Sequence, residues 1–394
     1  MNTPLYLSAR EAAAELGVQP ATLYAYVSRG LIRSMPGPGK QKRYDAADIR
    51  ALAAQKDRPD AAATSPLTGG LVLETRLTLI AEDGPWYRGH SALALAESFS
   101  LEAVAGLLWA CDSDPFAAPS PGPLPELPAG SAPLERLMLA LAAYPLLDPA
   151  AYTRAPALLP VKGAALLRLG VAALLGQPAP SAEPIHSQFA AAFGLTGDAG
   201  SELIRAALVL SADHELNTSA FAVRCAASTR APLHAALLSG LGAFSGPRHG
   251  AAADRVGAWL SDIGEAEDVP SVLQQRLQRG DPLPGFGHMV YRGADPRATC
   301  LLALGNRLLP GNRQLAMAPA LIGQAADLFG AGPNIDFALA VVVRALGLPA
   351  DAAKILFCAG RIVGWIGHAL EQMTVPEQIR PRATYVGERP RRGK

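Results

Sequence analysis

The chain has little of several features that would point to a specialised class of protein: four cysteines in 394 residues, 6% aromatic residues and 18% charged residues. The cysteines are scattered and show no Cys-x-x-Cys spacing, which argues against a disulfide framework or a zinc site. The net charge of +1 reveals no partner by itself, because a local basic patch can be hidden in a balanced total.

Long uncharged apolar runs are also scarce. Segments such as Gly163–Gly176 are interrupted by charges such as Arg168, and Met1–Glu11 lacks the apolar run of a signal peptide. We therefore expect a cytoplasmic protein without membrane contact. Hydrophobic residues make up 50% of the chain, which allows two or three domains with a substantial core.

The first 58 residues predict a small domain distinct from the rest. Ser8 followed by Glu11 is a capping-box pattern that begins a helix reaching Leu16, and Gly17 is placed to end it. Pro20 suits the first turn of a second helix that runs to about residue 29. Two short helices joined by a tight turn indicate a helix-turn-helix. The residues expected to face inward are Ala12, Leu16, Val18, Leu23 and Val27.

Residues 34–43 predict a wing, because Pro36-Gly-Pro-Gly39 separates two short extended arms. Asp45 is placed to cap a third helix that carries Ile49 and Leu52. With its Arg43-Tyr44 and Asp48-Ile49 ending, this pattern resembles the MerR-like winged helix-turn-helix family.

The resemblance implies DNA binding through residues 1–58, where basic residues outnumber acidic ones (9 − 5 = +4). A small interaction or dimer-contact module is the alternative. The residues expected to meet bases or phosphates are Thr22, Tyr24, Ala25, Ser28, Arg29, Lys42 and Arg43.

The remainder predicts a mainly α-helical body. Residues 59–70 are rich in Ala, Pro, Thr, Ser and Gly and indicate a linker. Leu71–Leu79 alternates enough for a short strand or hairpin that ends near Gly84, and the proline-rich stretch 112–130 predicts a surface loop. The helices expected after it are 134–147, 162–176, 198–212, 217–229, 231–244, 299–309, 319–329, 337–346 and 352–372.

One loop, Pro284–Arg297, combines groups suited to acid–base chemistry. Gly285 and Gly287 allow a tight turn and a close ligand approach, and His288 can exchange a proton near neutral pH. Arg297 carries a planar guanidinium that can bind a carboxylate with two hydrogen bonds. The pattern favours an acidic substrate; a glycine-rich loop with a chance histidine is the alternative.

Further candidates lie elsewhere in the chain. His249 stands at a glycine-flanked turn at a helix start, where the helix dipole would keep the imidazole neutral. His214 stands near another helix start, and the other four histidines are assigned to surface or packing. Asp336 is either a catalytic carboxylate or, with Asn334, part of a helix cap.

These motifs, in this order, resemble the citrate synthase family. They are Tyr87-Arg-Gly89, Asp213-His-Glu-Leu-Asn217, Ser245-Gly-Pro-Arg-His-Gly250, Gly287-His-Met-Val-Tyr-Arg292 with Asp295-Pro-Arg297, Asn334-Ile-Asp-Phe337, Ala359-Gly-Arg-Ile-Val-Gly-Trp365 and Ile379-Arg-Pro-Arg382. The resemblance implies a large domain of residues 71–249 and 351–394 and a small domain of residues 250–350.

The resemblance also implies the roles of single residues. Asp336 would be the base, His249 the donor to the thioester carbonyl and His288 the acid toward oxaloacetate. Oxaloacetate would be held by His214, Arg297, Arg361 and Arg380, the last from the neighbouring subunit of a homodimer. Coenzyme A would meet Leu283, Pro284, Gly285, Phe286, Gly287 and Arg292.

The implied activity is condensation of acetyl-CoA with oxaloacetate followed by hydrolysis to citrate and coenzyme A. The thioester is a substrate, and no metal or further cofactor is implied. Two alternatives stay open: a 2-methylcitrate synthase using propionyl-CoA, and a transcriptional regulator whose body senses a metabolite. Gly250-Ala-Ala-Ala253 replaces the usual Gly-Gly-Ala-Asn, which removes a polar contact beside the thioester site and leaves the acyl preference open.

Overall fold

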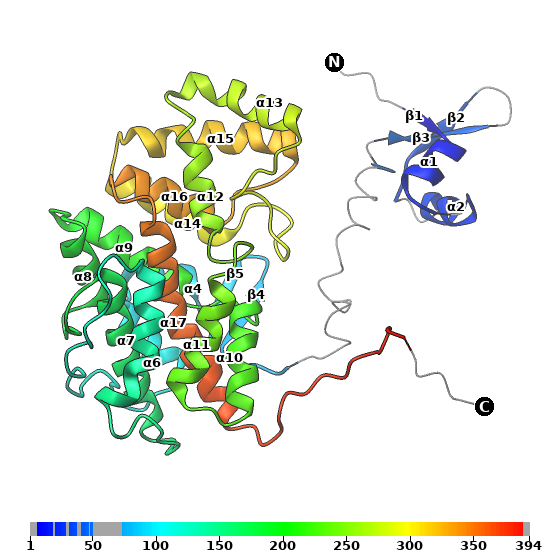
Figure 1. The fold of residues 1–394 in the computed structure, drawn as a ribbon. Coiled ribbons are helices and arrows are strands. Elements are labelled where there is room, and N and C mark those ends of the chain that lie inside the picture. Colours follow the sequence, from blue (N-terminus) through cyan, green and yellow to red (C-terminus); the bar gives the residue numbers. More distant parts are fainter. Residues whose placement is uncertain are drawn as a thin grey trace, which may run out of the picture. The chain divides into compact units, whose positions relative to one another are not determined.

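The computed structural model describes residues 6–18, 20–28, 31–37, 41–46, 48–49 and 73–388 (Figure 1). The chain divides into two compact units, one of residues 74–380 and the other of residues 1–73 with 381–394. Each unit is described by itself. The predicted linker, 59–70, lies outside the described residues.

The amino-terminal unit pairs two helices with a three-stranded antiparallel sheet in the order β1-β3-β2. Its elements are β1(Tyr6–Ser8), α1(Ala9–Glu15), α2(Pro20–Ser28), β2(Ser34–Pro36) and β3(Lys42–Asp45). The first two predicted helices and the two arms of the wing are confirmed. Strand β1, which the sequence analysis missed, pairs with β3 along its whole length.

Local chemistry explains this small fold. Ser8 and Glu11 form the predicted capping box, and Gly17 adopts a φ of 60°, which ends α1. Asp45 accepts a hydrogen bond from the backbone N–H of Asp48 at 3.3 Å, as expected of a cap, whereas Leu52 lies outside the described residues. The buried core consists of Ala12, Ala13, Leu16, Leu23, Ile32, Tyr44 and Ile49.

The larger unit begins with an antiparallel meander of three strands: β4(Thr78–Ala81), β5(Gly84–Tyr87) and β6(His90–Ser91). The expected strand at Leu71–Leu79 is therefore placed too early. Within the described residues the strand begins only at Thr78, and Gly84 opens the second strand instead of ending the hairpin. Glu82 and Asp83 make the turn, since Ala81 pairs with Gly84.

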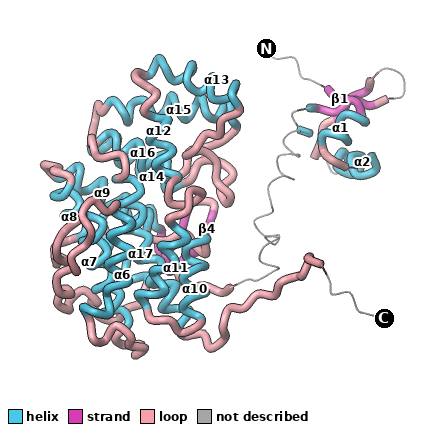
Figure 2. Tube along the Cα trace, in the orientation of Figure 1, coloured by secondary structure: helices cyan, strands magenta, loops and turns pink. Residues whose placement is uncertain are grey.

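The body that follows is almost entirely helical, which confirms the predicted fold class (Figure 2). Its first elements are α4(Ala92–Ser98), α5(Leu101–Leu108), α6(Pro133–Leu147), α7(Leu159–Leu175), α8(Ile185–Ala192), α9(Asp198–Ser211), α10(Thr218–Ser228) and α11(Leu233–Phe244). They are followed by α12(Ala252–Leu260), η1(Ala266–Asp268), α13(Val269–Arg279), α14(Pro296–Leu308), α15(Arg313–Phe329), α16(Ile335–Ala345) and α17(Ala352–Met373).

Some boundaries differ from expectation. Helix α15 begins at Arg313 and not at Pro319, because the Asn312 side chain caps it and the helix accommodates the proline inside. Helix α14 begins at Pro296, three residues before the predicted Thr299, with Asp295 as its cap. Helix α8 was not predicted. The proline-rich stretch 112–130 is a loop, as expected.

Helix α17 is the central element of this unit. It packs against α5, α7, α9, α10 and α11, and also against α12 and α16, which belong to the group of helices α12–α16 gathered at one end of the unit (Figure 1). By length and composition alone α17 could cross a membrane, but most of it is buried by its neighbours, as in the core helix of a globular unit. The division into large and small domains stays a prediction.

Candidate active site

Three loops, the first turn of α16 and helix α17 bring most of the predicted catalytic and oxaloacetate-binding residues together. His214 precedes α10, His249 precedes α12, His288 precedes α14, and Asp336 lies in the first turn of α16. Arg361, in the middle of α17, is close enough for its charge to act on the pKa values of His214, His249 and Asp336. The residues that the sequence scatters over nearly 150 positions therefore share one electrostatic environment.

His214 and His288 form a cluster with Tyr291. The rings of the two histidines are 5.2 Å apart between centroids, and the Tyr291 hydroxyl lies 3.1 Å from Nε2 of His214. Nδ1 of His288 accepts the backbone N–H of Val290 at 3.0 Å, so a neutral His288 carries its proton on Nε2. Burial, followed by the charge of Arg297, lowers the pKa of both histidines.

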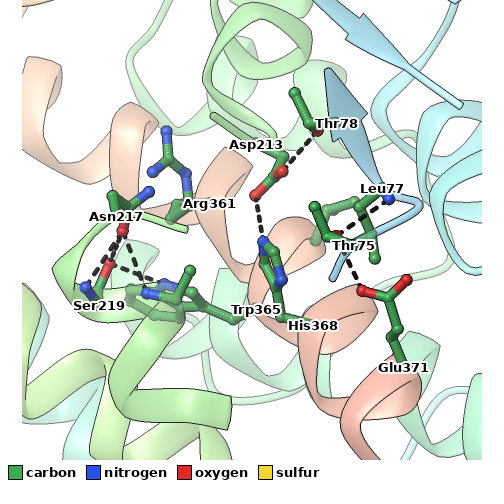
Figure 3. Close-up of polar contacts among 12 residues, drawn as sticks. Thr75, Leu77, Thr78, Asp213, Asn217, Ser219, Arg361, Trp365, His368 and Glu371 are labelled. Carbon is green, nitrogen blue, oxygen red and sulfur yellow. Dashed lines mark hydrogen bonds and ion pairs between the residues drawn. The ribbon is translucent and has the colours of Figure 1, made fainter. Parts of the chain in front are cut away.

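His249 is held from behind by a serine. Its Nε2 lies 2.8 Å from Oγ of Ser219. The same Oγ accepts the indole N–H of Trp365 at 3.0 Å (Figure 3). Its pKa is lowered to about 4, mainly by burial and further by Arg361. The imidazole is neutral as expected, but burial rather than a helix dipole is the principal cause.

Asp336 is not the helix cap. Asn334 caps α16, because its Oδ1 accepts the backbone N–H groups of Asp336 and Phe337 at 3.1 and 3.4 Å. Among the described residues, no hydrogen bond reaches the Asp336 carboxylate. Burial raises the pKa of that carboxyl to about 6, against the opposing charge of Arg297. A carboxylate without donors and with such a pKa is suited to act as a base.

Arg297 is engaged by a residue that the sequence analysis did not single out. Asp295 accepts from Nη2 and Nε of Arg297 at 2.7 and 3.1 Å, and both side chains are buried. Nη1 of Arg297 is buried and has no hydrogen-bond partner among the described residues. The guanidinium is thus fixed on one side and has one donor nitrogen left for a substrate carboxylate. The spacing Asp295-Pro-Arg297 was the available signal for this pair.

Arg361 is almost fully buried on α17. Its Nε donates to the backbone carbonyl of Ser211 at 3.0 Å, and the guanidinium lies 4.7 Å from the ring centre of Phe357. Burial lowers its pKa to about 10, so the group stays charged at neutral pH. Arg361 is thus a buried cation, and no carboxylate of the described residues forms an ion pair with it. Such a cation favours an anionic ligand.

The loop predicted to meet coenzyme A is fastened to the start of α16. Asn334 donates its backbone N–H to the carbonyl of Gly285 at 2.8 Å and its side-chain amide to the carbonyl of Gly287 at 3.0 Å. Gly285 has a φ of 87°, and a Cβ there would approach Phe337 and Val256 within 3.0 Å, so only glycine fits. Leu283 is buried, whereas Arg292 is exposed.

Arg380 is not brought to this cluster within one chain. It is exposed on the segment after α17, and the neighbouring Ile379 donates its backbone N–H to Ser228 at the far end of α10 from His214. In the amino-terminal unit, Tyr24 and Lys42 are exposed, and Thr22 and Arg43 are half-buried. Arg29 and the side chains of Ala25 and Ser28 lie outside the described part.

The sequence analysis missed a buried network of polar side chains that begins at Asp213, next to His214 in the chain. Asp213 accepts from Thr78 at 2.6 Å, and its other carboxylate oxygen lies 3.2 Å from Nε2 of His368; Figure 3 shows both contacts. Nδ1 of His368 accepts from Nε of Arg224 at 3.1 Å. His368 therefore has polar contacts at both ring nitrogens, in addition to the surface or packing role to which the sequence analysis assigned it. Within the described residues, no group of three His, Cys, Asp or Glu could hold a metal ion.

The site defines a class of protein: an acid–base enzyme with neutral histidines, a carboxylate base and buried arginines for an anionic substrate. The profile of the citrate synthase C-terminal domain matches residues 123–382, and that of a helix-turn-helix domain matches residues 6–57. The chain belongs to the citrate synthase family.

Relatives and solved structures agree with this assignment. Citrate synthase 2 of Bacillus subtilis is 36% identical over 47% of this chain and 51% of its own length, and citrate synthase of Haloferax volcanii is 37% identical over 48% and 51%. The chain thus spans about half the length of the curated relatives it matches. The fold resembles crystalline citrate synthase from Thermotoga maritima with a TM-score of 0.67 and 25% identity, covering 82% of this chain and 96% of that one.

Proposed function

We propose that this protein condenses acetyl-CoA with oxaloacetate and releases citrate and coenzyme A. The observation that carries the proposal is Asp336, a carboxylate without hydrogen-bond donors whose pKa is raised to about 6, in the field of Arg297 and Arg361. Family membership supports it, and so does the Thermoplasma acidophilum citrate synthase, whose structure contains carboxymethyl coenzyme A and oxaloacetate and resembles this fold.

The chemistry comprises two proton transfers, the formation of one carbon–carbon bond and the hydrolysis of the thioester. Asp336 removes a proton from the methyl group of the thioester, while His249 donates a hydrogen bond to the thioester oxygen. The resulting enolate, stabilised by the hydrogen bond from His249, attacks the ketone carbon of oxaloacetate, and His288 supplies a proton to the ketone oxygen through Nε2. Water then cleaves the thioester and releases the thiol. Acid–base help of this kind contributes roughly 10²–10⁴-fold.

The basic residues explain the choice of a dicarboxylate. Arg361 and the free Nη1 of Arg297 offer donors within one buried site, beside His214. In the proposal, Arg380 of a neighbouring copy completes this set, which requires a homodimer. The backbone of Leu283–Gly287 and the side chain of Arg292 receive coenzyme A. The protein acts in the cytoplasm without membrane contact.

The acyl group remains to be chosen by experiment. The 2-methylcitrate synthase of Shewanella oneidensis is 32% identical over 49% of this chain. The Ala253 side chain is small and has no polar atom to contact the acyl group. Purified protein is mixed with oxaloacetate and either acetyl-CoA or propionyl-CoA, and free thiol is followed with a dye. Oxaloacetate-dependent release with acetyl-CoA supports the proposal; preferred propionyl-CoA supports the methylcitrate alternative, and no release with either contradicts both.

A second role, DNA binding by the amino-terminal unit, is favoured by the helix-turn-helix match and by the exposed Tyr24 and Lys42. A MerR-like dimer would offer two such units to half-sites about one DNA turn apart. Binding to a fragment of the protein's own promoter is measured at several salt concentrations, with and without oxaloacetate. Loss of one phosphate contact in Lys42→Gln reduces the salt slope by about 1, whereas Arg279→Gln leaves it unchanged.

DNA binding that responds to oxaloacetate, in a protein that releases no thiol, would identify a metabolite-sensing regulator instead of an enzyme. No salt-sensitive binding to the promoter fragment would assign the amino-terminal unit to protein contacts.

A further inference from the structure

A cavity lies in the larger unit, lined by none of the candidate active-site residues. Its volume is about 710 Å³, within the range of sites for small organic ligands. It is bounded by the carboxyl-terminal end of α17, the α6–α7 connection and the α10–α11 connection. None of the proposed catalytic or substrate-binding residues lines it.

The cavity is strongly basic. Arg76, Arg88, Arg154 and Arg230 line it, and its single carboxylate is Glu371, which gives a formal charge of +3 (4 − 1). Glu371 does not neutralise them, because its oxygens already accept from Thr75, from the backbone of Arg76 and from Arg224.

The four arginines have no acidic partners of their own. None of them forms an ion pair with a carboxylate in the described part of the chain. Arg88 is half-buried, and its Nε donates to the carbonyl of Leu108 at 2.8 Å, which fixes the guanidinium. Burial and, after it, the neighbouring charge of Arg76 lower the pKa of Arg88. Like charges gathered without counter-charge are what an anion site requires.

The backbone around the cavity is strained. Four non-glycine residues of the described chain have φ in the left-handed region, and three of them, Arg88, Ala110 and Arg230, line this cavity with φ values of 46°, 55° and 61°. Such conformations persist where the surrounding structure demands them and gather at functional sites.

An apolar wall complements the charges. Trp109 lines the cavity, with its indole N–H donating to the carbonyl of Val363 at 2.9 Å, and Leu159 and Leu370 line it too. A ligand with charge alone would leave this wall uncovered, since apolar surface gains free energy when it leaves water. The cavity therefore suits a molecule with an anionic end and an apolar or aromatic body.

We infer that this cavity is a second ligand site that binds a small organic anion with two or more negative charges on an apolar or aromatic body. The site is separate from the proposed synthase site, so its occupancy can be measured whether or not the protein releases thiol. Arg76 and Arg154, both exposed, supply charge at the rim, and Arg88 supplies the fixed donor inside.

The test uses ATP as a probe with both features and pyrophosphate as a probe with charge alone, each titrated calorimetrically into the full-length protein. We expect ATP to bind one site per chain and more tightly than pyrophosphate. Each lost charge-assisted hydrogen bond costs about tenfold, so the double variant Arg76→Gln/Arg154→Gln binds ATP roughly 100-fold more weakly. Its unfolding temperature and its thiol release without ATP should match those of the wild type.

Two matched variants locate the binding. Arg279→Gln removes an exposed arginine outside the cavity, and Arg292→Gln removes the arginine assigned to coenzyme A. Both should keep the ATP affinity within about twofold. Absence of ATP binding, an unchanged affinity in the double variant, or an equal loss in Arg292→Gln would overturn the inference, the last by placing ATP in the coenzyme A site.

Discussion

The hydroxyl oxygen of Ser219 lies 2.8 Å from Nε2 of His249. It accepts the indole N–H of Trp365 at 3.0 Å, so its only proton goes either to His249 or to Oδ1 of Asn217, also at 2.8 Å. Oδ1 of Asn217 already accepts two backbone N–H groups. If the Ser219 hydroxyl donates its hydrogen bond to Nε2 of His249, the neutral imidazole carries its own proton on Nδ1. That N–H can then donate a hydrogen bond to the thioester oxygen.

Ser219→Ala should therefore lower kcat without much change in the KM for oxaloacetate. Loss of one orienting hydrogen bond to a catalytic ring is expected to cost about tenfold or more. Thiol release measures both constants. Ser239→Ala is the matched control, because Ser239 donates only to backbone carbonyls of Ala222 and Ala236. Equal kcat in the two variants would contradict the positioning role of Ser219.

Asp336→Asn separates catalysis from stability. In the wild type, Asp336 must be ionised to act as the base, so kcat should fall about tenfold per pH unit below the pKa of this carboxyl, about 6. His249, with a pKa of about 4, stays neutral down to that pH and does not cause the fall. The Asn variant should lose at least roughly 10²-fold in kcat. A pH–rate profile that stays flat down to pH 5 would show that Asp336 is not the base.

The same substitution should increase the stability of the protein although it lowers kcat. The folded carboxyl has a pKa of about 6, above the ordinary aspartate value of 3.8. The folded state therefore binds more protons between these values, and stability declines as the pH rises through that window. At pH 8, Asp336→Asn should raise the free energy of unfolding by on the order of 1–3 kcal/mol. Denaturant titration measures it, with the exposed Asp262→Asn as a control that stays near wild type.

Asp295 should matter more for stability than any exposed acid. It pairs with buried Arg297 and also accepts the backbone N–H of Ile335 at 3.3 Å, which joins the histidine loop to α16. Asp295→Ala leaves the guanidinium buried and unpaired, at an expected cost of about 3–5 kcal/mol. Asp281→Ala breaks the exposed pair with Arg279 and should cost about 1 kcal/mol or less. Similar unfolding midpoints for the two variants would refute this difference.

Mixed dimers test the proposed reach of Arg380. Asp336→Asn and Arg380→Gln are each expected to be inactive. If Arg380 serves the neighbouring site, a hybrid dimer of the two variants has one site with both mutations and one intact site. A co-refolded equal mixture should then recover about a quarter of wild-type activity, since half of the dimers are hybrids. No recovery, with hybrids confirmed by mass spectrometry, would place Arg380 in its own subunit's site or outside catalysis.

Much of this arrangement could be predicted from short sequence patterns. The capping box of Ser8 and Glu11, the wing arms and most helices follow from local rules and were found where expected. Errors came where one local signal was weighed alone. Pro319 was taken as a helix start, although Asn312 caps the helix two turns earlier, and Leu71–Leu79 was taken as a strand that begins only at Thr78.

By itself, the sequence determined the helical class and the family and supplied the candidate reactive residues, because each depends on residue types at fixed spacing. Only the tertiary structure decided the pKa values, and so the protonation states, of those residues. Asp336 has its raised pKa and His249 its lowered one because helices from distant parts of the chain bury them around Arg361. Likewise, the basic cavity exists because residues 76, 88, 154 and 230 meet at the end of α17. Burial and the summed field of charges depend on three-dimensional distance, which the order of residues does not state.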